Sequence, residues 1–465
     1  MKHRNYGTVD ARSSNFDDTR QTGRRADMAD VAAPTNECEC KKGMFVLAMT
    51  RRRVIAGGGV AAAIGAVGGL SRLVEAATAG AGIYPVPEDP TKEPGRTIGL
   101  DGGYGLRSQF ETEIRIVSPD STASFTPLQN SSGIITPSGL HFERHHNGIP
   151  NIDPARHRLL IHGMVDRPIW FSLADLKRFP TVSRAHFLEC SGNSGTEIMG
   201  AHEPTVQRTH GLVSTSEWTG IPLATLFKET ALKPGAAWVL AEGADAAIMT
   251  RSVPLDKCLS DALIVFGQNG EALRPEQGYP MRLFLPGWEG NMSIKWLRRL
   301  EVSDEPYYTR EETSKYTDLI TRTGKARIFT FTMEAKSVIT FPSGQMKLPG
   351  AGFYEISGLA WSGRGKIARV EVSTDAGKSW NRALLQEPVL AMCQTRFRFP
   401  WIWSGTPTVI TSRATDETGY FQPTHQQLIA LRGPLESGSR FYHMNAIQSW
   451  GIDADGSVRN VHPFG

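Results

Sequence analysis

One of the three cysteines in the long body of the chain has a sequence context suited to chemistry. Arg184 to Cys190 alternates like a strand and runs into Ser191-Gly192-Asn193, so the pattern predicts a strand that ends in a tight turn at Cys190. A thiolate placed there is a soft, strongly donating ligand for a metal ion. A generic cysteine is more often a small buried core residue, and we keep that interpretation for Cys258 and Cys393.

Two segments carry cations that could grip an anionic group. The first is Phe142-Glu143-Arg144-His145-His146, and the second runs from Gly278 through Arg282 to Lys295. Arginine binds phosphate as a bidentate fork and lysine binds it as a point charge. In a random sequence such residues would be surface charges. Arg282 is unusual because apolar residues stand on both sides of it.

Composition limits which classes of protein these residues can belong to. The chain has 465 residues, 51 Lys and Arg, 47 Asp and Glu, and 40% hydrophobic residues, which is ordinary for two or three globular domains. Residues 1–79 hold 12 basic and 8 acidic residues, so they account for the whole net charge of +4. A body of balanced charge argues against a nucleic-acid partner.

The N-terminal segment predicts export. Arg51-Arg52-Arg53 directly precede the apolar, Gly-rich and Ala-rich run 54–70, and Ala77-Thr78-Ala79 follows as a small-residue cleavage pattern. We interpret residues 1–79 as a polar extension and a twin-arginine signal peptide, which predicts a periplasmic protein. An uncleaved membrane anchor and an upstream start-codon error at residues 1–43 stay open. The odd number of remaining cysteines leaves at least one thiol unpaired in that oxidising compartment.

The hydrophobic pattern predicts an α+β fold in two parts. Residues 80–129 read as an extended arm, and 152–303 as a mixed sheet with short helices, including a helix over 172–179 and a hairpin at Asn269-Gly270. Further strands are expected at 328–333, 352–361, 367–373, 396–401 and 409–415, spaced as in a β-sandwich. We therefore predict domains at 80–325 and 326–465.

Three motifs, in order and spacing, resemble those of the sulfite oxidase family of molybdenum-cofactor enzymes. Phe142 to His146 is similar to its Phe-x-Arg-Asn-His entry motif, and His186 to Asn193 to its cysteine loop. The stretch from Gly278 to Trp296 resembles its pterin-phosphate segment. The resemblance spans roughly residues 140–440 and implies a molybdopterin-binding domain followed by an immunoglobulin-like dimerisation domain.

The resemblance also implies roles for individual residues. Cys190 would be the protein ligand of the metal, and Arg144 would additionally orient the substrate oxygen. Tyr316, 21 residues beyond Lys295, holds the place of an active-site tyrosine that could relay protons. His145 and Gln277 depart from the family's usual Asn and His. The contacts implied for the molybdopterin come from Arg144, His145, His146, Asp245, Gln277, Arg282, Ser293, Ile294 and Lys295.

Within the family, the chain most resembles the molybdenum subunit of sulfane dehydrogenases in bacterial thiosulfate-oxidising (Sox) systems. This implies oxidation of sulfane sulfur on a sulfur-carrier protein. No Cys-x-x-Cys-His haem motif occurs, so electrons would pass to a separate c-type cytochrome subunit. The expected assembly is a homodimer through the C-terminal domain or a heterotetramer with the cytochrome.

Three alternatives stay open. A periplasmic sulfite dehydrogenase would act on free sulfite, but Gly195 stands where the animal sulfite oxidases carry an arginine that helps to bind the dianion. A sulfoxide reductase is disfavoured by the second domain, because such reductases generally have one. A cofactor-free exported binding module is disfavoured by the joint presence of Cys190, Arg144 and Arg282 at motif positions.

Overall fold

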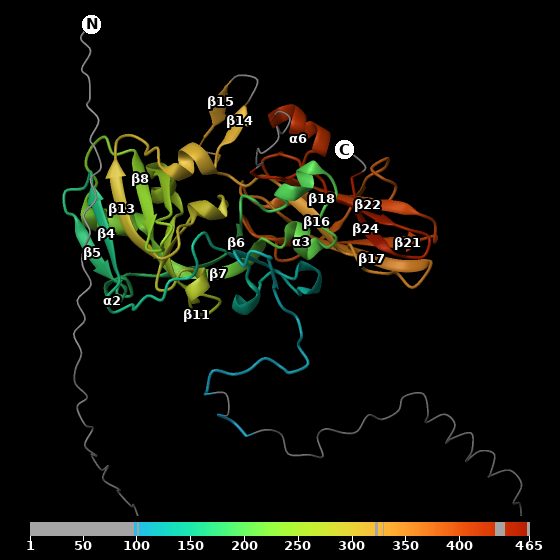
Figure 1. Cartoon of the computed structure of the whole chain (residues 1–465), viewed down its shortest axis with the longest axis horizontal. Helices are drawn as coiled ribbons and strands as arrows, with labels where there is room; N and C mark the ends of the chain where they lie inside the picture. Colours follow the sequence, from blue (N-terminus) through green and yellow to red (C-terminus); the bar gives the residue numbers. More distant parts are fainter. Residues whose placement is uncertain (1–96, 100–101, 321–323, 329, 433–441, 463–465) are drawn as a thin grey trace, which may run out of the picture. The chain divides into compact units, whose positions relative to one another are not determined.

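The computed structural model describes residues 97–99, 102–320, 324–328, 330–432 and 442–462 (Figure 1). The predicted leader, residues 1–79, lies outside these ranges. The chain divides into two units, Met1–Gly103 and Tyr104–Gly465. All helices and strands of the described residues belong to the second unit, and none of those helices is both long and apolar enough to cross a bilayer.

Residues 158–303 build two sheets around a shared apolar core. The first sheet has the order β5 (Ile169–Ser172), β4 (Arg158–Gly163), β13 (Leu297–Ser303), β8 (Trp238–Gly243) and β9 (Thr250–Pro254). The second has the order β11 (Glu271–Ala272), β10 (Leu263–Gln268), β7 (Val213–Pro222) and β6 (Val182–Glu189), with β12 (Arg282–Phe284) also paired to β10. Since β13 and β4 are parallel and the other pairs antiparallel, the first sheet is mixed. Leu159, Ile221 and Ile264, from strands of both sheets, share one buried cluster.

Short helices connect these strands. They are α2 (Leu173–Leu176), α3 (Val206–His210), α4 (Leu223–Thr230) and α5 (Leu255–Ser260). The predicted helix near residue 172 is confirmed as α2, where Ser172 and Asp175 form a reciprocal capping box. The predicted hairpin is also confirmed, because Gln268 pairs with Glu271 across Asn269 and Gly270, both at positive φ.

The predicted arm is only partly extended. Residues 104–115 contain no helix or strand and are mostly exposed. From Ile116 onward, however, the chain forms β1 (Ile116–Val117), β2 (Ala123–Phe125) and the 3-10 turn η2 (Leu128–Asn130), and β2 pairs with β3 (Glu143–Arg144). The arm prediction is therefore incomplete beyond residue 115, because it did not include these short pairings, such as Ile116 with Phe125 and Ala123 with Arg144.

Residues 336–461 form a β-sandwich (Figure 1). One sheet has the order β16 (Lys336–Phe341), β17 (Gly352–Trp361), β21 (Thr395–Trp403) and β20 (Leu384–Gln386). The other has the order β19 (Asn381–Arg382), β18 (Ile367–Ser373), β22 (Thr408–Asp416), β23 (Ser449–Ile452) and β24 (Val458–Val461). Trp361, Phe397 and Trp450 are fully buried in its core, and helix α6 (His425–Arg432) lies between β22 and β23 in sequence.

Four of the five strands predicted for this part are confirmed, as β17, β18, β21 and β22. The strand predicted at 328–333 is wrong. Its described residues bond to a loop of the first domain instead: Glu289 donates its N–H to the Phe331 carbonyl, and Met333 donates its N–H to the Gly287 carbonyl. Strand β16 was missed because five of its six residues are buried, which removes the alternation that marks a half-exposed strand.

The hairpin of β14 (Asp318–Ile320) and β15 (Lys325–Arg327) stands between these two groups of sheets in sequence, and the predicted boundary near residue 325 falls on it.

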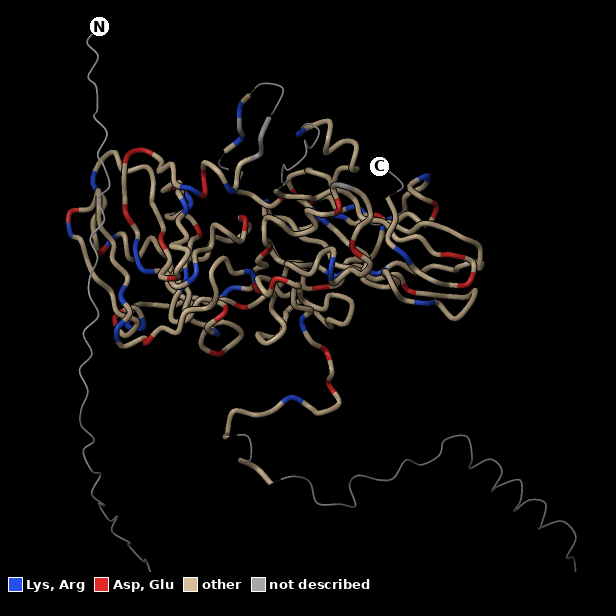
Figure 2. The backbone as a smooth tube through the Cα atoms, viewed as in Figure 1, with Lys and Arg blue, Asp and Glu red and all other residues tan. Residues whose placement is uncertain are grey.

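Lys and Arg are interspersed with Asp and Glu along the described residues (Figure 2), as the balanced composition led us to expect.

A buried ion pair joins the two groups of sheets. Lys336, at the start of β16, donates from Nζ to Oε1 of Glu189 at 3.0 Å, and the Nε1 of Trp361 donates to the other carboxylate oxygen at 2.6 Å. Asn193 adds a third donor at 2.9 Å. Burial lowers the pKa of Lys336, but the Glu189 carboxylate opposes this shift. Glu189 directly precedes Cys190, so the second domain holds the base of the cysteine loop.

We predict that Lys336→Met lowers the free energy of unfolding by about 3–5 kcal/mol, because it leaves the Glu189 carboxylate buried and uncompensated. Urea unfolding of the purified chain, followed by tryptophan fluorescence, measures the change. Lys347→Met is the matched control, since its ion pair with Asp455 is exposed and should contribute less than about 1 kcal/mol. Equal effects of the two substitutions would contradict the prediction.

Candidate functional site

A single cavity brings together every site residue predicted from the sequence. These residues are Arg144, His145, His146, Cys190, Asp245, Gln277, Arg282, Ser293, Ile294, Lys295 and Tyr316. They come from segments that are far apart in the chain. The cavity is also lined by residues to which the sequence analysis gave no individual role, namely Phe142, Glu143, Leu188, Met249, Gly290, Asn291 and Trp296.

Cys190 lies where β6 ends, at the turn that the sequence predicted. The turn closes with a hydrogen bond from the Asn193 N–H to the Cys190 carbonyl at 2.9 Å, and the thiol is half-buried. Burial raises the pKa of the thiol, which a neighbouring backbone N–H and Arg144 partly offset. Gly290 passes so close that a side-chain carbon there would lie 2.6 Å from the Glu189 carbonyl oxygen. A glycine is therefore required for this wall of the cavity.

Cys258 and Cys393 do not line the cavity. Cys258 lies in α5 within the core of the first domain, and Cys393 is buried just before β21. Burial raises the pKa of both thiols, that of Cys393 to about 11. Both therefore behave as small core residues.

His145 links Glu143, in the segment Phe142 to His146, with the cation Lys295. Its Nε2 donates to Oε2 of Glu143 at 2.9 Å, and its Nδ1 accepts from the Lys295 Nζ at 2.9 Å. Burial lowers the pKa of His145, so the ring is neutral and its Nδ1 can accept a hydrogen bond from the lysine. Lys295 also donates to the backbone carbonyls of Arg144 and Glu276.

Arg282 is a buried cation and Lys295 a half-buried one, and neither forms an ion pair with a carboxylate among the described residues. Within the described part of the chain, Arg282 donates only to the Gln277 and Ser293 carbonyls, and its Nε atom has no hydrogen-bond partner there. Burial lowers the pKa of Arg282 to about 9. Burial, together with Arg282, lowers the pKa of Lys295 to about 7. Because an uncompensated buried charge is costly, the arrangement fits a ligand that brings its own negative charge.

Asp245 and Gln277 line the cavity but are committed to the protein. Asp245 accepts from the Met249 N–H at 3.2 Å, and Gln277 donates from Nε2 to the Phe142 carbonyl at 2.8 Å. Their side chains therefore shape loops at the cavity wall. Gly278, at φ +106°, lies against Lys295, and a side chain there would crowd the lysine Cβ at 3.0 Å.

Tyr316 follows a π-helical turn, η7 (Glu311–Lys315), and is almost fully buried. Its hydroxyl lies 2.9 Å from the His146 Nε2. Burial raises the pKa of the phenol, and Cys190 acts in the same direction, so the phenol is protonated at neutral pH. Burial and Arg144 lower the pKa of His146 to about 4, so a neutral imidazole faces the phenol.

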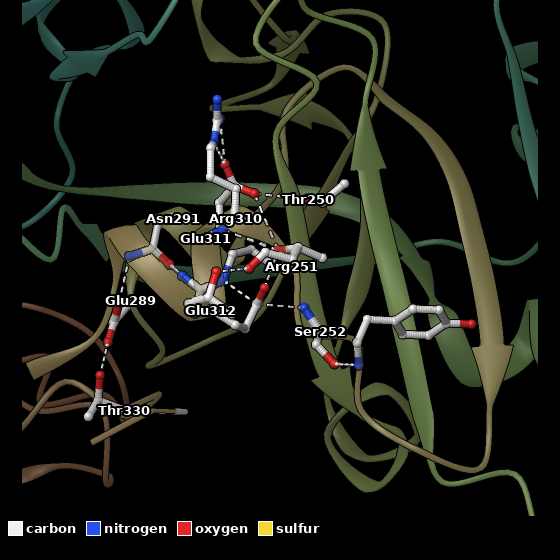
Figure 3. Close-up of polar contacts among 12 residues, drawn as sticks. Thr250, Arg251, Ser252, Glu289, Asn291, Arg310, Glu311, Glu312 and Thr330 are labelled. Carbon is white, nitrogen blue, oxygen red and sulfur yellow. Dashed lines mark hydrogen bonds and ion pairs between the residues drawn. The ribbon is translucent and has the colours of Figure 1, made fainter. Parts of the chain in front are cut away.

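A buried polar network lies behind this wall of the cavity (Figure 3). Arg251 on β9 donates to the Glu312 carboxylate and to the Asn291 amide oxygen. Asn291 in turn donates to Glu289 and to the Ser191 hydroxyl beside Cys190. The sequence did not reveal this network, because Arg251, Asn291 and Glu312 stand far apart along the chain and each reads alone as a polar surface residue.

The donor set bears on the kind of ligand the cavity suits. Among the described residues, no group of three or more His, Cys, Asp or Glu side chains could hold a metal ion by itself. A metal bound at Cys190 would need ligands from another molecule, and the unpaired cations Arg282 and Lys295 suit an anionic part of that molecule. A cofactor that carries both a metal and a phosphate fits these residues.

Known proteins share these features. Residues 146–311 match the family model of the oxidoreductase molybdopterin binding domain, and residues 327–449 match that of the Mo-co oxidoreductase dimerisation domain. The crystal structure of the sulfane dehydrogenase SoxCD from Paracoccus pantotrophus is similar with a TM-score of 0.76 and 45% identity, covering 82% of this chain and 97% of that chain.

Two curated proteins are also similar in sequence to this chain. The sulfite oxidase of Gallus gallus is 30% identical over 333 residues, which are 65% of this chain and 71% of that protein. The nitrate reductase of Ulva prolifera is 30% identical over 329 residues, which are 63% of this chain and 38% of that protein. The chain thus spans little more than a third of the length of that nitrate reductase. The two domain matches and the sulfite oxidase similarity show that the chain belongs to the sulfite oxidase family of molybdenum-cofactor oxidoreductases.

Proposed function

We propose that the chain is the molybdenum subunit of an exported sulfane dehydrogenase. It would oxidise sulfane sulfur held on a carrier protein and pass the electrons to a c-type cytochrome. The observation that carries the proposal is the cavity that Cys190 shares with Arg282 and Lys295, two cations that pair with no carboxylate among the described residues. The 45% identity to the sulfane dehydrogenase SoxCD supports the choice of substrate class.

The chain's residues would hold the cofactor at two ends. Cys190 would bind the metal as a thiolate, since metal binding removes the proton that burial otherwise retains. Arg282 and Lys295 would bind the pterin phosphate, with Ser293 and Ile294 lining the same side. When bound, the cofactor supplies two-electron oxidation of sulfur with transfer of one oxygen atom that derives from water.

The remaining residues would handle substrate charge and protons. Arg144 lines the cavity and would orient an anionic sulfur oxide as it forms. The protonated Tyr316 would donate a hydrogen bond toward the reacting sulfur group. The neutral His146, whose Nε2 lies 2.9 Å from the phenol oxygen, would donate a hydrogen bond to that oxygen in its Nε2-protonated tautomer and so leave the phenol proton available to the sulfur group.

One feature favours sulfane over free sulfite as the proposed substrate. Gly195 opens the short 3-10 helix η4 (Gly195–Met199) where the animal sulfite oxidases carry an arginine. Without that bidentate donor, a small free dianion would be held less tightly, whereas a carrier-bound group is positioned by the carrier itself. The similarity to the sulfite oxidase of Gallus gallus keeps free sulfite as the competing substrate.

The proposal is tested by measuring metal and substrate together. We expect about one molybdenum per chain, and turnover of carrier-bound sulfane with cytochrome c at a kcat/KM well above that for sulfite. Cys190→Ser should reduce activity by more than the roughly 10–100-fold typical of residues that only support a ligand, while Cys393→Ser keeps the metal. A purified protein without molybdenum, or saturable turnover of micromolar sulfite alone, would refute the sulfane assignment.

Lys295 predicts a pH dependence of anion binding in the cofactor-free chain. A lysine is charged below its pKa, which lies near 7 here, so its charge is present at pH 6 and lost by pH 8.5. Sulfate, which does not titrate in this range, should bind about tenfold more weakly at pH 8.5 than at pH 7. Calorimetric titration measures the affinities. Lys295→Met should abolish the dependence, and a slope that survives this substitution would contradict the prediction.

Export and assembly form a separate part of the proposal. The paired Arg51 and Arg52 support transport of the folded protein to the periplasm, and the match to a dimerisation domain supports a homodimer or a heterotetramer with the cytochrome. In cell fractionation, the wild-type chain should reach the periplasm, and the variant with both arginines changed to lysine should accumulate in the cytoplasm.

The proposed assembly is tested separately, because light scattering of the purified complex gives its mass. A monomer without cytochrome would contradict the assembly.

A further inference from the structure

The Tyr316 side chain is held from three sides. Its hydroxyl meets the His146 Nε2 at 2.9 Å, and its ring lies 5.2 Å from the ring of Tyr442, which belongs to the segment before β23. On the remaining side, the guanidinium of Arg251 lies over the ring, 4.9 Å from its centre. Of these three neighbours, only Arg251 carries a permanent charge.

The Arg251 side chain is buried and is held in place by hydrogen bonds from its guanidinium. Its side chain is 1% exposed, its Nε donates to Oε1 of Glu312 at 2.8 Å, and its Nη1 donates to the Asn291 amide oxygen (Figure 3). The same Glu312 oxygen also accepts from the Ser252 N–H at 2.8 Å. The guanidinium therefore has little freedom to move away from the ring.

The anchor of Arg251 lies on the turn that carries Tyr316. Glu312 is part of the π-helical turn η7, which closes with a hydrogen bond from the Tyr316 N–H to the Glu311 carbonyl at 2.9 Å. Glu311 is also held, since it accepts from the Thr250 hydroxyl at 2.9 Å. A π-helical turn is an unfavourable backbone arrangement that persists where side chains stabilise it. Strand β9 thus restrains both the backbone of this turn and the aromatic ring at its end.

We propose that Arg251 is a positioning residue for Tyr316: it ties the π-helical turn through Glu312 and holds the phenol ring so that its hydroxyl faces the cavity. The proposal rests on the role proposed above for Tyr316. Arg251 does not line the cavity. It acts through the tyrosine, by geometry and by the attraction between a cation and an aromatic face.

The consequence for catalysis follows from the need for exact placement of a reacting group. Displacement of such a group by about 1 Å can cost a hundredfold in rate. Arg251→Met keeps the length of the side chain but removes its charge and its hydrogen bonds. We expect kcat with the sulfur substrate to fall by about tenfold to a hundredfold, with KM changed less than about threefold. Arg251→Lys, which keeps the charge but not the planar fork, should restore part of kcat.

The deciding measurement reads the tyrosine directly. The chain has ten tyrosines, so incorporation of 3-fluorotyrosine gives a small set of fluorine resonances, and Tyr316→Phe identifies that of Tyr316. In Arg251→Met this resonance should shift and narrow, as the ring becomes free to reorient. If Arg251→Met does not fold, Glu312→Gln should give the same change with a smaller amplitude.

Arg413→Met is the matched control, because Arg413 also lies over an aromatic ring, that of Trp380, 4.2 Å from its centre in the second domain. It should leave the Tyr316 resonance and kcat unchanged. An unchanged Tyr316 resonance in Arg251→Met, or in Glu312→Gln if the former does not fold, would overturn the proposal. An equal shift in Arg413→Met would overturn it too. The resonance is observed without turnover. An enzyme inactive toward sulfane would therefore contradict the proposed function, but the role of Arg251 in positioning Tyr316 could still be tested.

Discussion

The arrangement of the site depends on the hydrogen bonds made to the buried carboxylate of Glu189. It receives hydrogen bonds from Lys336 and Trp361 of the sandwich and from Asn193 of the cysteine loop. These bonds satisfy a charge that would be costly to bury alone. Since the next residue is Cys190, the position of the proposed metal ligand is set by the packing of the second domain as much as by the first. The sandwich therefore has a structural role in the site in addition to any role in dimerisation.

Charge around the cavity is arranged in two different ways. On one side, Arg251 is neutralised by Glu312, and His443 forms an ion pair with Glu289, whose carboxylate raises the pKa of that histidine against the effect of burial. On the other side, Arg282 and Lys295 have no carboxylate partner among the described residues. The first arrangement makes a rigid wall, and the second leaves positive charge for an anionic ligand. One cavity can thus combine a preorganised reaction site with an anchor for a phosphate.

Local sequence was a good guide wherever neighbouring residues decide the structure. Ser172 and Asp175 complete a capping box within four residues, and Asn269-Gly270 forms a two-residue hairpin, so both could be predicted. Strands β17 and β18, in which part of the residues alternate in burial, were also found. The strand predicted at 328–333 failed because those residues bond to a loop of the first domain. Strand β16 escaped notice because burial on both faces removes the alternation.

For the site, the sequence by itself determined which residue types stand at the motif positions, and through the family resemblance it indicated Cys190, Arg144, Arg282, Lys295 and Tyr316. It could not determine which side chains lack partners, because pairing depends on what lies opposite in space. Only the tertiary structure decided that Arg282 and Lys295 line the cavity without a carboxylate partner among the described residues, and that Arg251, Asn291 and Glu312 meet behind Tyr316. The physical reason is that burial and hydrogen bonding join residues whose separation along the chain carries no signal of their contact.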